Sequence, residues 1–321
     1  MWKHSKVLSA SLLVLSLACP ALADDRTIPI TDDRGVIVEV PSDPRNIAAV
    51  SYLAVDVGLA LGVAPSRFAV TYMTKGRDPE FLLGLTKDMA SLGQRAKPNL
   101  ELVSQAKPDL IVAMKRYTVG NAASYEKIAP YLAFNIERYD ESFREVAELS
   151  KAFGQPEKGE ALNAAFRQHL ADYVAKAPND VHPRFQIMWA GDTPFSFHTE
   201  NTAASIVAAL GGDNIVGPMT QGGRFGMEMS LEAMLEKDPE VIFVYDSGPD
   251  RPQENNPIWS QLSAVKNKRV HYVGDQWVET NGPIAREIVL REAAHYLYPD
   301  TFPAVDVRAE AAKLIPADIR K

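Results

Sequence analysis

Arginine, tyrosine and tryptophan side chains recur near the ends of the strands that the hydrophobic pattern predicts. Ligands of α/β sheets bind beyond the carboxyl ends of the strands, so side chains placed there are candidates for a binding site. Arginine can donate two parallel hydrogen bonds to a carboxylate, and aromatic rings offer flat apolar area with a polar edge. The pattern predicts a site for an anionic ligand with an apolar or ring-bearing periphery. The candidate residues are Tyr52, Tyr72, Arg95, Arg116, Trp189, Arg224 and Trp277.

Each candidate also has a purely structural interpretation. Arg116 and Arg224 could be solvated arginines in loops. Trp189 and Trp277 could belong to the hydrophobic cores at the lobe edges. Position alone does not separate these interpretations from a role in binding.

The sequence offers neither a catalytic set nor a set of metal ligands. Cys19 is the only cysteine, and no Gly-x-Ser-x-Gly run is present. The histidines beyond the first 30 residues are scattered, without the paired spacing of a metal site. They are His169, His182, His198, His271 and His295. We therefore expect no catalytic residue and no metal held directly by the protein.

Predicted strands and helices alternate along the chain, after a hairpin over residues 28–40. Strands are expected over 46–50, 68–70, 108–114, 131–136, 184–189, 239–245 and 269–273. Helices are expected over 53–62, 99–106, 125–128, 143–153, 205–210, 230–236, 258–265 and 286–297. This alternation predicts an α/β fold with two lobes and mostly parallel central sheets.

A longer helix is predicted over residues 156–177, between the two halves. Pro156 can occupy its first turn, and Pro178 ends it. Its predicted apolar face is narrow and rich in alanine, which suits a helix that lies across two lobes. That face contains Leu162, Ala165, Phe166, His169, Leu170, Tyr173, Val174 and Ala177. The predicted organisation is an N-terminal lobe over 24–155, a linker helix over 156–177 and a C-terminal lobe over 178–321.

The first 23 residues have the features of a secretory signal peptide. Lys3 and Lys6 precede an apolar stretch over residues 7–18, and Ala21 and Ala23 form a small-residue cleavage site. A lipoprotein anchor at Cys19 is the less favoured alternative. The formal net charge of −7 argues against nucleic-acid binding. We therefore expect an exported protein located in the periplasm.

One short pattern occurs in both halves. Asn99, Leu100 and Glu101 precede a predicted strand, as do Ser230, Leu231 and Glu232. In each case a capping residue opens a helix and the glutamate lies in its first turn, where the helix dipole favours a negative charge. Helix-start chemistry alone would explain both glutamates.

In their order and spacing, these features resemble the periplasmic binding proteins that serve iron–siderophore and cobalamin ABC importers, the class with a single-helix linker. The motifs are Asp33-Arg34-Gly35, Pro44-Arg45-Asn46-Ile47, Leu61-Gly62-Val63, Leu92-Gly93-Gln94-Arg95, Pro98-Asn99-Leu100-Glu101, Ile128-Ala129-Pro130, Leu210-Gly211-Gly212-Asp213-Asn214-Ile215 and Ser230-Leu231-Glu232. Within the family, the resemblance is strongest to members that bind ferric dicitrate. It includes Phe197-His198-Thr199-Glu200, Asn256-Pro257-Ile258-Trp259 and Trp277 ahead of Arg286-Glu287.

The resemblance implies a monomeric binding protein and not an enzyme. It would capture an iron(III)–siderophore complex such as ferric dicitrate, delivered by an outer-membrane receptor, and pass it to an ABC permease in the inner membrane. Iron would be held by the chelator, so no cofactor is expected. Glu101 and Glu232 would contact arginines of the permease. Closure of the lobes should be small.

Several alternatives remain open from the sequence. Within the family, the cargo could be a catecholate or mixed siderophore, haem or cobalamin. Haem would require an axial tyrosine or histidine, and Tyr52 and Tyr72 keep that option open. Outside transport, a secreted hydrolase or a metal-cluster protein lacks the residues that its chemistry requires. A signalling protein that senses the same cargo is not distinguished from a transporter.

Overall fold

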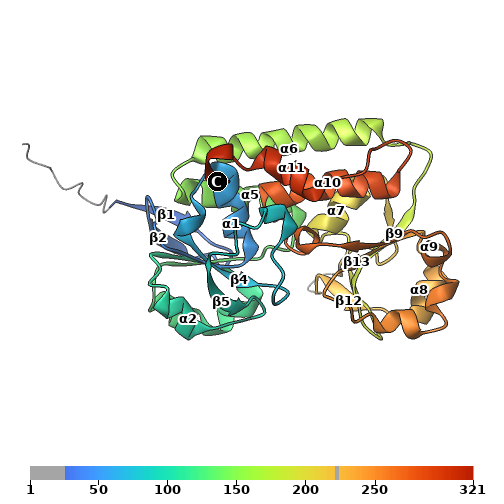
Figure 1. Ribbon diagram of the computed structural model, residues 1–321, viewed down its shortest axis with the longest axis horizontal. Coiled ribbons are helices and arrows are strands. Elements are labelled where there is room, and N and C mark those ends of the chain that lie inside the picture. The colour runs from blue at the N-terminus through green and yellow to red at the C-terminus, as the bar shows by residue number, and fades with distance from the viewer. Residues whose placement is uncertain (1–25, 221–223, 321) are drawn as a thin grey trace, which may run out of the picture.

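The computed structural model describes residues 26–220 and 224–320, which form two lobes below a layer of helices (Figure 1). The N-terminal lobe contains a sheet in the order β6-β5-β4-β3-β7-β8. All its pairings are parallel except that of β6 with β5. Its strands are β3 (Ile47–Val50), β4 (Phe68–Tyr72), β5 (Ala90–Gln94), β6 (Lys97–Pro98), β7 (Leu110–Met114) and β8 (Tyr131–Phe134).

The C-terminal lobe has a sheet in the order β12-β10-β9-β13-β14, with β11 also paired to β9. Strands β9, β13, β14 and β11 pair in parallel, whereas β10 pairs antiparallel with both of its neighbours. The strands are β9 (Arg184–Trp189), β10 (Phe195–Phe197), β11 (Asp213–Asn214), β12 (Gly226–Glu228), β13 (Val241–Tyr245) and β14 (Val270–Val273). The predicted α/β class with mostly parallel sheets is confirmed.

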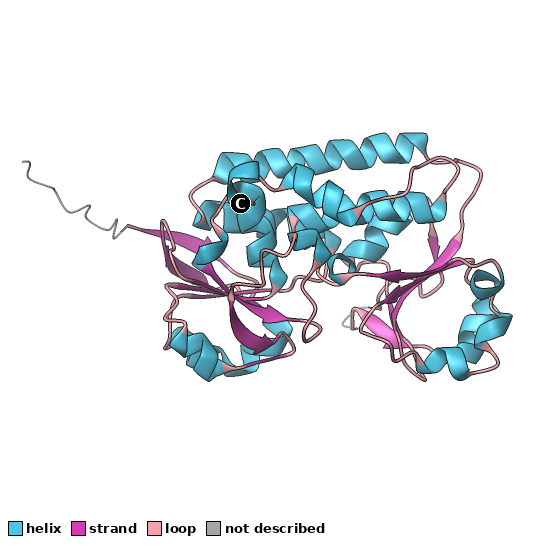
Figure 2. Ribbon diagram, in the orientation of Figure 1, coloured by secondary structure: helices cyan, strands magenta, loops and turns pink. Residues whose placement is uncertain are grey.

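Helices cover both faces of each sheet (Figure 2), so strands such as β7 and β13 are buried along their whole length. The helices are α1 (Tyr52–Leu61), α2 (Leu100–Gln105), α3 (Lys115–Thr118), α4 (Ala122–Glu126), α5 (Tyr139–Ala152), α6 (Pro156–Lys176), α7 (Thr202–Ala209), α8 (Leu231–Lys237), α9 (Ser263–Lys266), α10 (Pro283–Leu297) and α11 (Val307–Leu314). The predicted hairpin is present as β1 (Thr27–Thr31) paired with β2 (Ile37–Pro41).

Three helices contact the cores of both lobes. On α6, Leu162 packs against the core of the N-terminal lobe and Phe166 belongs to that of the C-terminal lobe. Helix α10 contacts the core of the N-terminal lobe through Ile288 and that of the C-terminal lobe through Leu290. Helix α5 lies beside α6. The lobes therefore share a layer of three helices, whereas the sequence predicted a single connecting helix.

The buried face of α6 differs from the predicted face. Val174 is 38% exposed and Ala165 is also exposed, whereas Gly159 and Asn163 are buried. The Asn163 side chain donates to the Phe143 carbonyl oxygen at 2.8 Å and accepts from Arg286 at 2.7 Å. The helix thus packs through a glycine and a buried asparagine that is hydrogen-bonded at both ends of its amide group, which a hydrophobic pattern does not detect.

The end of the chain returns to the first lobe. Ala311 and Ile315, at the end of α11, belong to the core of the N-terminal lobe. The sequence prediction assigned these residues to a C-terminal lobe over 178–321, because contact with a distant core is not visible in chain order.

The predicted signal peptide over residues 1–23 and Cys19 lie outside the described residues. Within the described part of the chain, no helix is both long enough and apolar enough to cross a membrane.

Candidate ligand-binding cleft

A cavity of about 750 Å³ lies between the lobes, a volume typical of small-molecule sites. Its walls come from the carboxyl ends of β4, β5 and β7 in one lobe and of β9 and β13 in the other, together with β10 and the loop before β12. Among the described residues that line it, four are cationic and none is acidic: Lys75, Arg95, Arg116 and Arg224. The cleft is therefore cationic within an acidic protein.

Arg95 is a buried member of this set. Its Nη1 atom donates to Glu279 at 3.0 Å, and its guanidinium lies 5.5 Å from the centre of the Tyr117 ring. Burial works to lower the pKa of Arg95, but Glu279, Tyr117 and Tyr245 together outweigh it, so the net shift is upward. Glu279 also accepts a hydrogen bond from the Tyr52 backbone N–H at 2.6 Å. The guanidinium therefore stays charged and fixed at the cleft wall.

Arg116 lies where the two lobes meet. Its guanidinium forms an ion pair with Glu137 and donates to the Tyr117 hydroxyl at 2.8 Å. It also lies 4.3 Å from the centre of the Phe225 ring, on the opposite lobe. Burial raises the pKa of Glu137, and the nearby Arg116 and Arg95 oppose this shift.

The other two cations are exposed and have no ionic partner among the described residues. Arg224 lies 5.7 Å from the Phe195 ring, and Lys75 faces the cleft from the loop after β4. These two side chains are free to meet charge on a ligand.

Aromatic side chains fill most of the remaining wall. The rings of Trp189 and Tyr245 meet edge to face, with their centres 4.4 Å apart, at the ends of β9 and β13. Tyr117, Phe195 and Phe225 complete the aromatic lining. Flat rings of this kind suit a ligand with apolar or ring-bearing groups around a charged centre.

The structure brings Arg95, Arg116, Trp189 and Arg224 together in the cleft, but it places the other three predicted site residues elsewhere. Tyr52 and Tyr72 line a separate cavity of about 300 Å³ in the N-terminal lobe. The Tyr52 hydroxyl accepts from the Met73 backbone N–H at 3.3 Å, and burial raises its pKa. Trp277 is a core residue, because its indole N–H donates to Glu292 at 2.8 Å and its ring stacks on Phe243.

Some residues that line or support the cleft were not among the sequence candidates. Phe195 lies on β10, a three-residue strand whose pattern is too short to predict. Tyr245 was taken as part of a buried strand, although it ends that strand at the cleft. Tyr245 directly precedes the polar residues Asp246 and Ser247, and this position could have identified it as a cleft residue.

Arg77 connects the lobes beside the cleft. From the N-terminal lobe it donates to the Asp246 carbonyl oxygen, to the Asp275 carboxylate and, at 3.1 Å, to the Tyr245 hydroxyl. Tyr245 in turn donates to Asp275 at 2.6 Å. Because the Asp275 side chain is buried, this group fixes one lobe against the other.

The two glutamates of the repeated pattern lie in similar settings. The Asn99 side chain caps α2 and the Ser230 side chain caps α8, so Glu101 and Glu232 both occupy first helical turns and are exposed. The two helices lie at the far ends of the lobes, on the side opposite α6 (Figure 1). A partner that spans both lobes could therefore reach both carboxylates.

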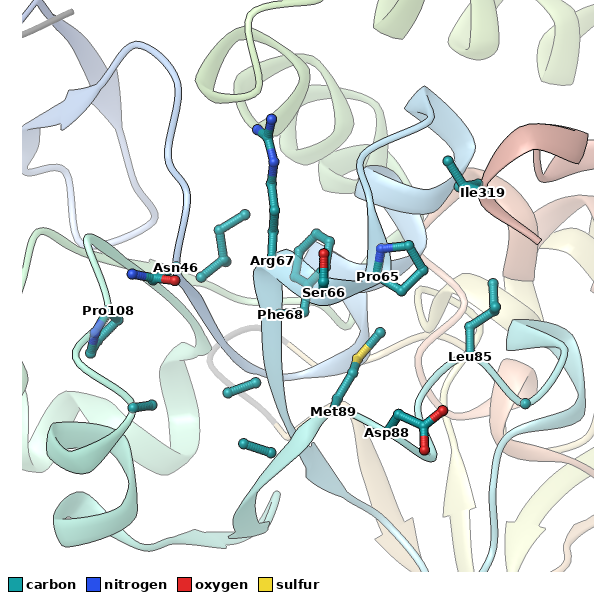
Figure 3. A pocket seen from close by; sticks show the side chains of 15 residues that line it. Asn46, Pro65, Ser66, Arg67, Phe68, Leu85, Asp88, Met89, Pro108 and Ile319 are labelled. Atoms are coloured by element: carbon teal, nitrogen blue, oxygen red, sulfur yellow. The ribbon is translucent and has the colours of Figure 1, made fainter. Parts of the chain in front are cut away.

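A second cavity, of about 620 Å³, lies at the amino ends of β3 and β4 (Figure 3). Its one arginine, Arg67, is paired with Asp43 at 2.7 Å. Because sheets of this type bind ligands at the carboxyl ends of their strands, the cleft between the lobes is the better candidate.

Comparison with known proteins agrees with this geometry. The family model for periplasmic binding proteins matches residues 47–277. The chain belongs to this family. A periplasmic binding protein binds and releases its ligand without altering it, so this chain is not an enzyme.

Two similar proteins bind iron–citrate complexes, as their names state, and a third has a structure solved with staphyloferrin B. The chain is 25% identical to the Fe(3+)-citrate-binding protein YfmC of Bacillus subtilis, over 93% of this chain and 99% of that protein. It is 27% identical to the Fe(3+) dicitrate-binding periplasmic protein FecB of Escherichia coli, over 86% of this chain and 90% of FecB. Among solved structures, it is similar to Staphylococcus aureus SirA complexed with staphyloferrin B. The TM-score is 0.66 at 23% identity, covering 83% of this chain and 98% of SirA.

Proposed function

We propose that this periplasmic binding protein captures an anionic iron(III)–siderophore complex, ferric dicitrate or a similar chelate, and delivers it to an ABC permease in the inner membrane. The supporting observation is the cleft itself, in which four cationic side chains and five aromatic side chains face one cavity. Arginine is well suited to the carboxylates of a chelate, and the rings suit its periphery. The names of YfmC and FecB favour citrate as the chelator.

In this proposal the protein recognises the chelate and does not ligate the metal. The cleft-lining residues among those described include no histidine, cysteine, aspartate or glutamate, and the hydroxyls of the two lining tyrosines, Tyr117 and Tyr245, are hydrogen-bonded to Arg116 and Asp275. Export to the periplasm, supply by an outer-membrane receptor and a monomeric state belong to the same proposal. Glu101 and Glu232 would meet the permease, one from each lobe.

Another cargo of the family is the second candidate, favoured by the number of rings in the cleft. A catecholate siderophore would stack on Trp189 or Tyr117 and pair with the arginines. Haem would need an axial ligand. Tyr52 and Tyr72, on which that option depended, do not line the cleft, and the hydroxyls of Tyr117 and Tyr245, which do, are hydrogen-bonded to Arg116 and Asp275.

Native mass spectrometry against a panel of ferric siderophores, haem and cobalamin tests the proposal. We expect a one-to-one complex with ferric dicitrate or another anionic ferric chelate, and no complex with the iron-free chelator. Selective binding of haem or cobalamin, or of no ferric chelate, would overturn it.

A further inference from the structure

Two of the four cations in the cleft are already neutralised by the protein. Arg95 is paired with Glu279, and Arg116 is paired with Glu137. Lys75 and Arg224 have no ionic partner among the described residues. The four lining cations and the two carboxylates paired with them carry a net charge of +2.

The two carboxylates differ in how they are held. The Glu279 side chain is fully buried and also accepts from the Tyr52 backbone N–H, so it supports the fold at the start of α1. The Glu137 side chain remains 19% exposed, and the Arg116 guanidinium is its one ion-pair partner among the described residues. Glu137 can therefore be changed without leaving a backbone donor unpaired.

The position of the Glu137–Arg116 pair lets it influence a ligand directly. Arg116 lines the cleft and lies between the Tyr117 ring, 4.5 Å from its centre, and the Phe225 ring of the other lobe. The two rings contact the guanidinium, and the Arg116 side chain remains 28% exposed. Charges in such partly buried surroundings interact more strongly than charges in water.

We infer that Glu137 sets the charge of the chelate that this cleft accepts. The Glu137 carboxylate neutralises the positive charge of Arg116. The cleft therefore favours chelates with about two negative charges over more highly charged chelates, because additional negative charge on a ligand would meet a carboxylate instead of a free cation. Glu137 is a specificity-determining residue that acts through Arg116. The inference rests on the proposed function.

Isothermal titration with a series of ferric chelates tests this role. The series runs from an uncharged trihydroxamate through diferric dicitrate, in which two Fe(III) ions and two fully deprotonated citrates leave a net charge of about −2, to a trianionic tris-catecholate. Each chelate is titrated into the wild-type protein and Glu137→Gln. In the variant we expect the tris-catecholate to bind about tenfold more tightly and the trihydroxamate to change less than about twofold. Glu157→Gln, which removes the same charge from the exposed first turn of α6, is the matched control and should leave all affinities unchanged.

The double variant Arg116→Gln/Glu137→Gln separates charge from shape. It restores a net charge of +2, so it should return the relative affinities of the series to those of the wild-type protein. Equal changes for all chelates in Glu137→Gln, or no change, would overturn the inference while leaving the proposed function intact. Failure of every ferric chelate to bind the wild-type protein would overturn both.

Discussion

Gly159 is the point of closest approach between α6 and α5, and replacing it with alanine should destabilise the helix layer. A Cβ atom built on Gly159 would lie 2.2 Å from the Ser150 Oγ atom and 2.3 Å from its Cβ atom. Both distances are far below van der Waals contact. Because the second obstacle is a Cβ atom, no rotation of the Ser150 side chain can remove it, so the helices must move apart.

Two opposing effects determine the size of this change. Alanine in place of glycine inside a helix stabilises it by about 1 kcal/mol. Overpacking a tight contact typically costs about 1–3 kcal/mol, and a clash of this depth should reach or exceed the upper end. We therefore expect the free energy of unfolding of Gly159→Ala to fall by about 2 kcal/mol.

Urea unfolding followed by circular dichroism measures the effect, with Ser150 variants as controls. Ser150→Ala retains the obstructing Cβ atom, so it should not rescue Gly159→Ala, and the Ser150 hydroxyl has no hydrogen-bond partner to lose. Ser150→Gly removes both obstructing atoms, so the double variant Ser150→Gly/Gly159→Ala should be about 1 kcal/mol more stable than Ser150→Gly alone, which is the gain expected from alanine in place of glycine inside a helix. A Gly159→Ala protein as stable as the wild type, or more stable, would refute the packing of α6 described above.

Three further predictions follow. Burial raises the pKa of Asp56 to about 7 and that of Glu145 to about 8, so the folded state binds more protons than the unfolded chain at neutral pH. The free energy of unfolding should therefore rise as the pH falls from about 8.5 to about 6.5, and Glu145→Gln should weaken this dependence in urea titrations; a flat profile in the wild type would contradict it. Arg77→Met removes the donor that joins the lobes at Asp275. It should raise the dissociation rate constant of the chelate by about tenfold in stopped-flow measurements. An unchanged rate constant would show that the helix layer alone holds the lobes together. Glu101→Gln together with Glu232→Gln should leave chelate affinity unchanged but abolish transport by the reconstituted permease, and normal transport would exclude them from docking.

The sequence was sufficient to predict the order of the main elements. Buried parallel strands are continuous apolar runs, and capping residues such as Asn99 and Ser230 mark helix starts, so both signals are local. The short strands β10 and β12 carry too few residues for a pattern, and Gly226 opens β12. The contact of Ala311 with the first lobe depends on tertiary packing alone.

Only part of the candidate site could be predicted from the sequence, because the direction of a side chain also depends on tertiary packing. Sequence position shows that a residue follows a strand, but not which way its side chain points. Trp277 follows β14 and turns into the core, where Glu292 accepts its indole N–H. The pairing of Arg95 with Glu279 joins residues 184 positions apart, so no local pattern could indicate that this arginine is already neutralised.

Tryptophan fluorescence during titration with ferric citrate tests the central claim, that the cleft between the lobes is where an iron chelate binds. Trp189 lines the cleft, whereas Trp277 is 3% exposed in the core of the C-terminal lobe. We expect saturable quenching in the wild-type protein, nearly the same quenching in Trp277→Phe, and loss of most of it in Trp189→Phe, with no response to iron-free citrate. Quenching of Trp189→Phe as strong as that of the wild type, or no saturable quenching in the wild-type protein, would contradict the claim.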